Sequence, residues 1–249
     1  MQLHHFFEQN PRIAIAFSGG VDSSYLLYAA KEAGCDVHAY FIKAEFQPQF
    51  EFEEAVYIAK FLDITLTVET FSVLSEPDVV SNSAERCYHC KTKILERLWS
   101  LARDDGFTVL CDGTNADDDE SDRPGMKALR EQGVVSPLRE GNLCKREIRA
   151  LSKKAGLPSH NKPAYACLAT RIPTGTPITR EFLTKIERAE GALFEMGFSD
   201  FRVRLIPPDI AKIQMTAKQW KKAAKMRKEI QEALENDFNS IVFDLGFRG

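Results

Sequence analysis

The residues with the clearest chemical potential form a short run after an apolar stretch near the beginning of the chain. Ile13 to Phe17 is apolar and predicts a buried parallel strand, and a helical pattern with Leu26 and Leu27 apolar ends at Gly34. Between them lie seven candidate ligand-binding residues: Ser18, Gly19, Gly20, Val21, Asp22, Ser23 and Ser24. Glycines let backbone approach a ligand closely, and N–H groups and Ser hydroxyls at a helix N-terminus bind anions. The run predicts a phosphate site, with Asp22 able to orient a metal ion.

The spacing of this run matches neither the Walker pattern, which needs a Lys before Ser or Thr, nor G-x-G-x-x-G. It resembles the pyrophosphate loop (PP-loop) of ATP pyrophosphatases, which has the form Ser-Gly-Gly-x-Asp-Ser. The resemblance implies use of ATP and Mg²⁺, cleavage between the α and β phosphates, and adenylation of a carboxyl or carbonyl oxygen. A nucleophile then displaces AMP. The alternative is a Gly/Ser-rich turn from strand to helix with no ligand.

The elements that must position this loop alternate between strands and helices. Apolar runs predict strands at Val37–Ile42, Ile64–Val68 and Phe107–Cys111, and helical periodicity predicts helices at Glu51–Phe61, Lys91–Ala102 and Lys145–Ala155. The alternation predicts an α/β fold with a doubly wound parallel sheet, in which ligands bind beyond the carboxyl ends of the strands. The loop after Cys111 is therefore expected to face the same nucleotide, with Gly113, Thr114 and Asp117 as candidate contacts. Asp117–Glu120 is a run of four acids, for which a solvated loop is the default interpretation.

Three segments of different character predict the domain organisation. Residues 1–160 hold the alternating strands and helices, and residues 161–178 form a Cys-containing linker with several Pro and Gly residues. Residues 179–249 predict a small α+β domain for substrate binding or oligomerisation. Its expected elements are helices at Thr179–Met196 and Lys218–Leu234, and strands at Phe201–Leu205, Ile210–Met215 and Ile241–Leu245.

Composition and charge exclude several classes of protein. An apolar content of 44% and a charged content of 28% are those of a soluble globular protein. The net charge of −3 gives no global basic surface, so no nucleic-acid partner is expected. No apolar run approaches the roughly 18 residues of a membrane span, and the start of the chain lacks a signal-peptide pattern. We therefore expect a cytoplasmic protein whose six cysteines are metal-binding, catalytic or buried, not disulfide-bonded.

Four further segments resemble the ATP-dependent sulfur transferase family LarE, which helps to make the nickel-pincer nucleotide cofactor of lactate racemase. They are Arg86-Cys87-Tyr88-His89-Cys90-Lys91, Asp112-Gly113-Thr114-Asn115-Ala116-Asp117-Asp118 with Arg123-Pro124-Gly125, the stretch from Lys162 to Gly175, and Phe201-Arg202-Val203-Arg204. The resemblance implies the adenine nucleotide α-hydrolase-like (PP-loop) fold. It also implies adenylation of a carboxylate of a pyridinium biscarboxylic acid mononucleotide and its conversion to a thiocarboxylate.

Within this family the source of sulfur differs between members. Some take sulfur from one of their own cysteines, which matches Cys167 here, and leave dehydroalanine. Others carry three cysteines that bind a 4Fe–4S cluster, whose unique iron holds the hydrosulfide that is transferred. Because this chain has Cys87 and Cys90 together with Cys167, it resembles the cluster-bearing branch.

Physical reasoning about the cysteines agrees with the cluster but leaves alternatives open. Two thiolates three residues apart at a helix start converge on one metal, and Lys91, Arg86 and Arg171 lie close enough in sequence to lower thiol pKa values. A zinc site with His89, a dithiol pair or a buried Cys167 are the alternatives. The remaining cysteines are expected to be packing residues: Cys35, Cys111 and Cys144, with Cys111 as a spare ligand.

Charged residues in the C-terminal third of the chain complete the candidate site. Arg202 and Arg204 alternate on a strand and so share one face, where paired guanidiniums suit a phosphate or carboxylates; a solvated face is the alternative. Arg171 is a further candidate for substrate binding. Glu190 matches an acidic family position near the substrate, although a surface glutamate is nearly as common. The candidate catalytic residues are therefore Cys167, Asp22, Lys91 and Glu190.

The sequence departs from the family directly after Arg204. The family continues after Arg204 with a His and a Gly, whereas Leu205-Ile206-Pro207-Pro208 follows here, so that a substrate contact from that His is absent. The alternatives are an amide-forming ligase similar to NAD synthetase, a non-catalytic nucleotide sensor, a tRNA thiolase and a single-turnover sulfur transferase. The resemblance also implies a homo-oligomer, possibly a hexamer. A sulfide donor or a downstream nickel-inserting protein is the implied partner.

Overall fold

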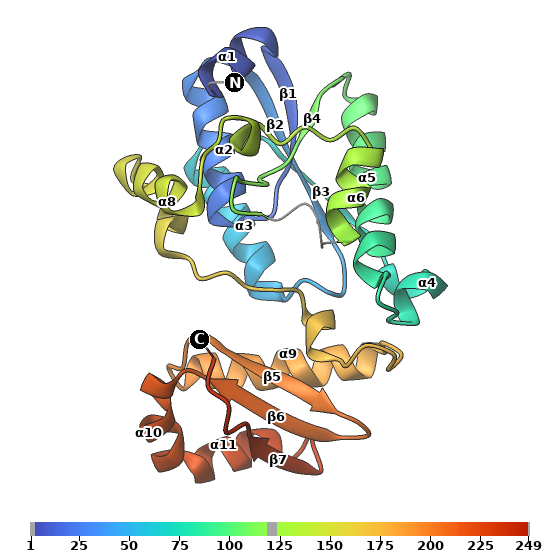
Figure 1. Cartoon of the computed structure of the whole chain (residues 1–249), viewed down its shortest axis with the longest axis vertical. Coiled ribbons are helices and arrows are strands. Elements are labelled where there is room, and N and C mark those ends of the chain that lie inside the picture. Colours follow the sequence, from blue (N-terminus) through green and yellow to red (C-terminus); the bar gives the residue numbers. More distant parts are fainter. Residues whose placement is uncertain (1–2, 119–123, 249) are drawn as a thin grey trace. The chain divides into compact units, whose positions relative to one another are not determined.

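A computed structural model describes residues 3–118 and 124–248 of the chain. These residues form two compact units (Figure 1). The first contains residues up to Val73 and Glu85–Ala164, and the second contains Leu74–Ala84 and the residues from Tyr165 onward. No helix in the described part is long and apolar enough to cross a membrane.

The first unit is built on a four-stranded sheet in which all strands are parallel. The strands are β1 (Arg12–Ala16), β2 (Asp36–Lys43), β3 (Leu66–Thr70) and β4 (Leu110–Cys111), in the order β3-β2-β1-β4. Because β1 and β4 are neighbours, with Ile15 opposite Cys111, the loops after their carboxyl ends emerge side by side. The predicted α/β fold with a parallel sheet is confirmed.

Helices cover both faces of this sheet (Figure 1). One face carries α1 (Leu3–Gln9), α2 (Val21–Glu32), α3 (Gln49–Phe61) and α8 (Lys145–Lys154), and the other carries α5 (Arg86–Asp104) and α6 (Pro124–Glu131). Side chains of β1 alternate between the two cores: Ile13 and Ile15 pack under α2, and Ala14 packs toward α5. A strand buried on both faces explains the continuous apolar run of the sequence. The remaining short helices of this unit are α7 (Pro137–Glu140) and the 3₁₀ turn Pro158–Asn161.

Three elements differ from their predicted extents by more than a shift of one or two residues at their ends. Helix α5 begins at Arg86, before the predicted Lys91, so that Cys87 and Cys90 lie in its first turns. Strand β4 is reduced to two residues, although the Ala14 N–H already bonds the Val109 carbonyl at 2.9 Å. The predicted helix at Lys218–Leu234 is two helices, α10 (Ala217–Lys225) and α11 (Arg227–Leu234), which meet at Met226. No proline or glycine explains this break.

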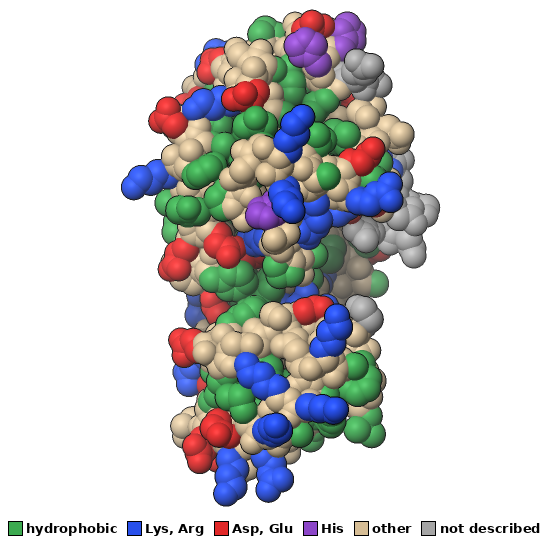
Figure 2. All heavy atoms as spheres, turned by 90° about the vertical axis from the view of Figure 1, so that its left-hand side faces the viewer, with side chains coloured by type: hydrophobic (Ala, Val, Ile, Leu, Met, Phe, Trp, Pro, Cys, Tyr) green, Lys and Arg blue, Asp and Glu red, His purple; other side chains and the backbone are tan. Residues whose placement is uncertain are grey.

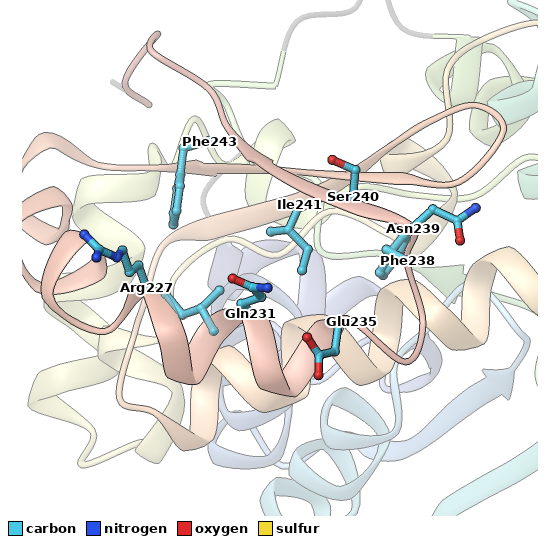
Figure 3. Close-up of a pocket in the computed structure, with 9 residues that line it drawn as sticks. Arg227, Gln231, Glu235, Phe238, Asn239, Ser240, Ile241 and Phe243 are labelled. Carbon is cyan, nitrogen blue, oxygen red and sulfur yellow. The ribbon is translucent and has the colours of Figure 1, made fainter.

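The second unit packs α9 (Arg180–Glu195), α10 and α11 with a three-stranded sheet. The strands β5 (Phe201–Ile206) and β6 (Ile210–Met215) form an antiparallel hairpin, and β7 (Ser240–Phe243) runs parallel to β6. A groove of about 380 Å³ lies between α11 and β7, lined by residues such as Gln231 and Ile241 (Figure 3). No residue that the sequence analysis singled out lines it.

A segment from the middle of the sequence belongs to this second unit. It contains α4 (Pro77–Val80), preceded by the 3₁₀ turn Val73–Ser75. The buried Asn82 side chain donates to the carbonyls of Pro173 and Thr176 at 2.9 and 3.0 Å, and the Gly175 N–H donates to the Asn82 carbonyl at 2.9 Å. These bonds hold the Pro-containing segment that the sequence analysis placed in a linker.

Candidate functional site

The backbone of the PP-loop depends on Gly19 for two reasons. Its φ of +69° lies in the left-handed region, and a Cβ built on it would stand 2.9 Å from the Cβ of Ala55 in α3. Helix α2 begins at Val21, and its N-cap, Gly20, supplies no side-chain hydrogen bond. Its first N–H groups therefore have no acceptor within the helix, which makes this end an anion site.

The serines of the loop shape it from within. The Ser24 hydroxyl donates to the Gly20 carbonyl at 2.7 Å, and the Ser23 hydroxyl lies 3.3 Å from the same oxygen and 3.1 Å from the Ser18 hydroxyl. Ser23 and Ser24 are buried, whereas Ser18 is exposed. The structure gives Ser23 and Ser24 a role in holding the loop, and their contact with a phosphate stays a prediction.

The loop after β4 lies directly against the PP-loop, as the sheet topology predicts. A Cβ on Gly113 would stand 2.7 Å from the Ser23 nitrogen, so only glycine allows this approach. Buried Asp112 fixes the loop because its carboxylate accepts bonds from the Thr114 hydroxyl at 2.6 Å and the Ser136 hydroxyl at 2.7 Å. Thr114 is therefore held by Asp112, and its contact with a nucleotide stays a prediction.

The acidic run of this loop is partly described. Asp117 is exposed, and its carboxylate accepts the Lys145 N–H at 2.8 Å, at the beginning of α8. Asp118 accepts the Asn115 N–H at 3.0 Å. Both carboxylates thus take part in local hydrogen bonds, and the role of Asp117 at a nucleotide is untested. The predicted Arg123 and the end of the run, 119–120, lie outside the described residues.

Asp22 pairs with a residue that the sequence analysis missed. Its Oδ2 accepts a very short hydrogen bond from the Lys145 ammonium, while Oδ1 is buried without a hydrogen-bond partner. Burial raises the pKa of the Asp22 carboxyl, and the Lys145 hydrogen bond acts in the opposite direction. A cation at the first position of a helix opposes the helix dipole, and this was the sequence signal for Lys145.

A second lysine reaches the PP-loop from the Lys162–Gly175 segment. The Lys162 ammonium lies 3.3 Å from the Gly19 carbonyl, 2.5 Å from a Glu54 oxygen and 3.8 Å from a Glu51 oxygen. Its side chain is only 12% exposed. Arg149 holds the Lys162 carbonyl at 2.7 Å. Lys162 therefore ties the PP-loop to α3, a contact that no local sequence pattern indicates.

Two of the three predicted cluster ligands lie together at the start of α5. Cys87 is exposed and Cys90 half-buried, three residues apart on one helix. The Lys91 ammonium lies 3.9 Å from an Asp112 oxygen, and Gly125 leaves room for its side chain, since a Cβ there would stand 3.3 Å from Lys91 Cδ. In the described ranges no group of three or more Cys, His, Asp or Glu side chains is arranged to hold a metal. Cys167 belongs to the other unit, so the convergence of the three thiols stays a prediction.

In the second unit, Arg171 fixes the backbone around Cys167. Its Nη1 donates to the Ala166 carbonyl at 2.8 Å and contacts the Cys167 carbonyl at 3.4 Å, at the start of the 3₁₀ turn Leu168–Arg171. Its Nε and Nη2 donate to Glu190 at 2.9 and 3.1 Å. The Arg171 and Glu190 side chains are 1% and 2% exposed, so the interpretation of Glu190 as a surface residue is wrong.

Glu190 uses both carboxylate oxygens for internal hydrogen bonds. Besides Arg171, the Val203 N–H donates to it at 2.9 Å, and the Tyr165 hydroxyl donates a very short bond. These bonds explain why a carboxylate is tolerated inside the unit. They make Glu190 a positioning residue for Arg171, and a catalytic role for Glu190 is untested.

Arg202 and Arg204 lie on the same face of β5, as their spacing predicts. Arg202 is only 7% exposed, so the solvated-face alternative is wrong for it. The guanidiniums of Arg171 and Arg202 stand 4.5 and 5.2 Å from the Tyr165 ring centre, and Arg204 donates to the Thr170 carbonyl at 2.6 Å. Burial and the charge of Arg171 lower the pKa of both β5 arginines. The cluster of these residues with Glu190 holds three cations and one carboxylate, an excess that suits an anionic ligand.

Comparisons with known proteins show which family the chain resembles. Residues 11–92 match the family described as the tRNA methyl transferase HUP domain. The pyridinium-3,5-bisthiocarboxylic acid mononucleotide synthase of Lactiplantibacillus plantarum is 34% identical over 206 residues, which cover 82% of this chain and 74% of that protein. Uncharacterized proteins of Synechocystis sp. and Methanocaldococcus jannaschii are 35% and 32% identical, over 87% and 82% of this chain and 81% of each relative.

The parallel sheet, the PP-loop at its carboxyl edge and the HUP match define the class as PP-loop nucleotide-using enzymes. Within this class, the chain belongs to the LarE-type family of ATP-dependent sulfur transferases, which includes the L. plantarum synthase.

Proposed function

We propose that this enzyme adenylates a carboxylate of a pyridinium biscarboxylic acid mononucleotide and converts it to a thiocarboxylate. The observation that carries the proposal is the 34% identity to the bisthiocarboxylic acid mononucleotide synthase over most of both chains. The Asp22-bearing PP-loop and the Arg202–Arg204 pair support it, because the first suits the polyphosphate of ATP and the second suits a substrate with a phosphate and carboxylates.

In the first step, the substrate carboxylate attacks the α-phosphorus of ATP and pyrophosphate leaves. The N–H groups at the start of α2 neutralise the developing negative charge on the leaving group. The buried, unpartnered Oδ1 of Asp22 fits a Mg²⁺ ligand, since an isolated carboxylate oxygen in the interior is costly. Mg²⁺ bound there would supply Lewis-acid stabilisation of the phosphates.

In the second step, sulfur attacks the acyl carbon and AMP leaves with the electrons of the broken C–O bond. We assign Cys167 to this step, as a ligand of the sulfur-carrying centre or as the sulfur source. In the sacrificial form, the Cys167 thioester loses its α-proton and its Cβ–S bond breaks, which yields the thiocarboxylate and dehydroalanine. A 4Fe–4S cluster bound by Cys87, Cys90 and Cys167 would instead supply hydrosulfide. The adjacent thiols on α5 fit two of its three ligands.

The decisive experiment incubates anaerobically reconstituted enzyme with Mg·ATP, sulfide and pyridinium-3,5-biscarboxylic acid mononucleotide. Mass spectrometry should detect the thiocarboxylate, with AMP and pyrophosphate in matching amounts, and Asp22→Ala should abolish all three products. Ammonium salts in place of sulfide test the NAD synthetase-like alternative. An amide product with ammonia but no thiocarboxylate with sulfide would overturn the proposal, as would unchanged turnover in Asp22→Ala.

We also propose a homo-oligomer, possibly a hexamer, that works in the cytoplasm and receives sulfide from, or passes its product to, another protein. The resemblance of the cysteine and arginine segments to the LarE family supports this. Light scattering coupled to size-exclusion chromatography should give a mass above that of the monomer. A monomer at micromolar concentration would contradict it.

A further inference from the structure

Asp22 and Lys145 form an ion pair at the place where a polyphosphate is expected. Asp22 is the acidic residue in the first turn of α2, and Lys145 is the first residue of α8, which lies beside α2 (Figure 1). The side chains are 18% and 33% exposed. The pair is therefore half-buried, and solvent still reaches the lysine.

This arrangement is unfavourable for α8 taken alone. A lysine at the first position places a positive charge at the positive end of the helix dipole, and Arg146 follows it. The Lys145 backbone is held in place because its N–H donates to Asp117 at 2.8 Å. The side chain, by contrast, is a flexible stem with a compact charge that can change partners.

Asp22 is also incompletely satisfied by this pair. Lys145 bonds Oδ2 only, and Oδ1 is buried without a partner. A divalent cation would satisfy this oxygen and would compete with Lys145 for the carboxylate. Once the carboxylate is neutralised by the cation, the lysine becomes available for the anion that arrives with it.

We propose that Lys145 is a pyrophosphate-binding residue that occupies Asp22 only in the nucleotide-free enzyme. When Mg·ATP binds, Mg²⁺ replaces the ammonium at Asp22, and the ammonium moves to the β and γ phosphates at the N-terminus of α2. Lys145 then stabilises the leaving pyrophosphate and makes no contact with the adenylate half. The inference rests on the proposed function, because it assumes ATP cleavage between the α and β phosphates.

Binding of the separated products tests this assignment without turnover. Isothermal titration would measure Mg·pyrophosphate and AMP binding to the full-length wild type, Lys145→Met and Lys145→Gln. The matched control is Lys154→Met, which removes an exposed lysine from the last turn of the same helix. Loss of a charge-assisted contact should weaken pyrophosphate binding by about 10- to 100-fold in both Lys145 variants. AMP binding, and all binding by Lys154→Met, should stay within about threefold.

Metal-free pyrophosphate provides a second, independent readout. Asp22→Asn should bind it more tightly than wild type does, because Lys145 is released and a repelling charge is removed. Adding Lys145→Met to Asp22→Asn should remove most of this gain. Because Lys145→Gln keeps a polar partner for Asp22, it serves if the Met variant folds poorly.

The outcomes separate this inference from the proposed function. If both Lys145 variants bind pyrophosphate as tightly as the wild type does, the role of Lys145 is overturned. If the wild type still forms thiocarboxylate in that case, the proposed function stands. Equal weakening of AMP and pyrophosphate binding would also overturn it, because the lysine would then be structural. Wild-type enzyme that binds pyrophosphate but forms no thiocarboxylate would instead remove the proposed function.

Discussion

Inside the second unit, Nε and Nη2 of the Arg171 guanidinium donate hydrogen bonds to the Glu190 carboxylate at 2.9 and 3.1 Å. The third nitrogen, Nη1, holds the backbone at Ala166 and Cys167. One buried ion pair thus links helix α9 to the segment that presents the candidate sulfur residue. We therefore expect a substitution at Glu190 to disturb the backbone around Cys167.

Replacing Glu190 with Gln should therefore destabilise the protein strongly. Arg171 would lose the carboxylate that it binds with two nitrogens, and Arg202 and Arg204 would lose a nearby negative charge. Breaking a buried ion pair from one side costs about 3–5 kcal/mol. Urea unfolding should show this loss. Glu195→Gln, on the exposed face of the same helix, should change the free energy of unfolding by less than about 0.5 kcal/mol. Equal stability of the two variants would refute the bridging role of Glu190.

Gly19→Ala should disrupt the PP-loop because the new Cβ would clash with a neighbour. Gly34→Ala is the control that has similar backbone strain without such a clash. Gly19 and Gly34 have φ values of +69° and +79°, but only Gly19 faces a neighbour, at 2.9 Å, whereas Gly34 has open space. Both alanine variants incur left-handed backbone strain of about 1–2 kcal/mol. Gly19→Ala should be less stable than Gly34→Ala and should also lose nucleotide binding. If both variants bound nucleotide equally, the close approach of the loop to Ala55 would be irrelevant.

Asp244 should make the stability of the folded protein depend on pH in the acidic range. Hydrogen bonds from Gln214 and the Gly246 N–H, together with Lys212, lower the pKa of its carboxyl from 3.8 to about 2. A lowered folded-state pKa stabilises the protein above about pH 4, and this contribution disappears as the pH falls through about 2. The stability difference between wild type and Asp244→Asn should thus shrink on acidification. A difference that is constant between pH 2 and 6 would contradict it.

Asp244 also acts on the candidate substrate site through Gln214. The Gln214 amide donates to Asp244 at 2.6 Å, and its carbonyl accepts Arg204 Nε at 2.5 Å. The same Asp244→Asn variant should therefore raise the KM for the nucleotide substrate more than it lowers kcat. A change in kcat alone would show that Asp244 does not contribute to substrate binding.

Local patterns were sufficient to predict the strand, loop and helix around the PP-loop. The apolar run of β1 reflects burial on both faces, and Gly19 marks the turn that only glycine adopts. That the loops after β1 and β4 lie next to each other followed from the parallel topology alone. These features depend on residues that are close in sequence or on a general rule of sheet construction.

The partners of the site residues could not be predicted in the same way. Lys145 is 123 residues from Asp22, and Lys162 is 143 residues from Gly19. The apolar spacing of α9 places Glu190 on the same buried face as Ile186 and Leu193. Its partner could not be read from that pattern, because Arg171 lies in a different element. Pairings of this kind depend on how distant segments pack, which one sequence without its fold does not indicate.

The last prediction concerns the three cysteines proposed as cluster ligands. Cys87→Ala, Cys90→Ala and Cys167→Ala should each lose iron after anaerobic reconstitution with iron and sulfide, since three ligands leave no redundancy. Cys35→Ala is the matched control, because Cys35 is half-buried near the Phe7 and Asn10 carbonyls and its pKa is raised by burial. Iron content and visible absorbance are the measurements, and the control should retain both.

Product formation in the same variants distinguishes the two sources of sulfur. If Cys87→Ala and Cys90→Ala lose iron yet still form a single equivalent of thiocarboxylate, Cys167 is the sacrificial donor, and its mass should fall by that of hydrogen sulfide. If they lose iron and form no product, sulfur delivery depends on the cluster. Normal iron and turnover in all three variants would remove the cysteines from the mechanism. The proposed adenylation at the PP-loop would then stand alone, because its proposed residues, Asp22 and the N-terminus of α2, include no thiol.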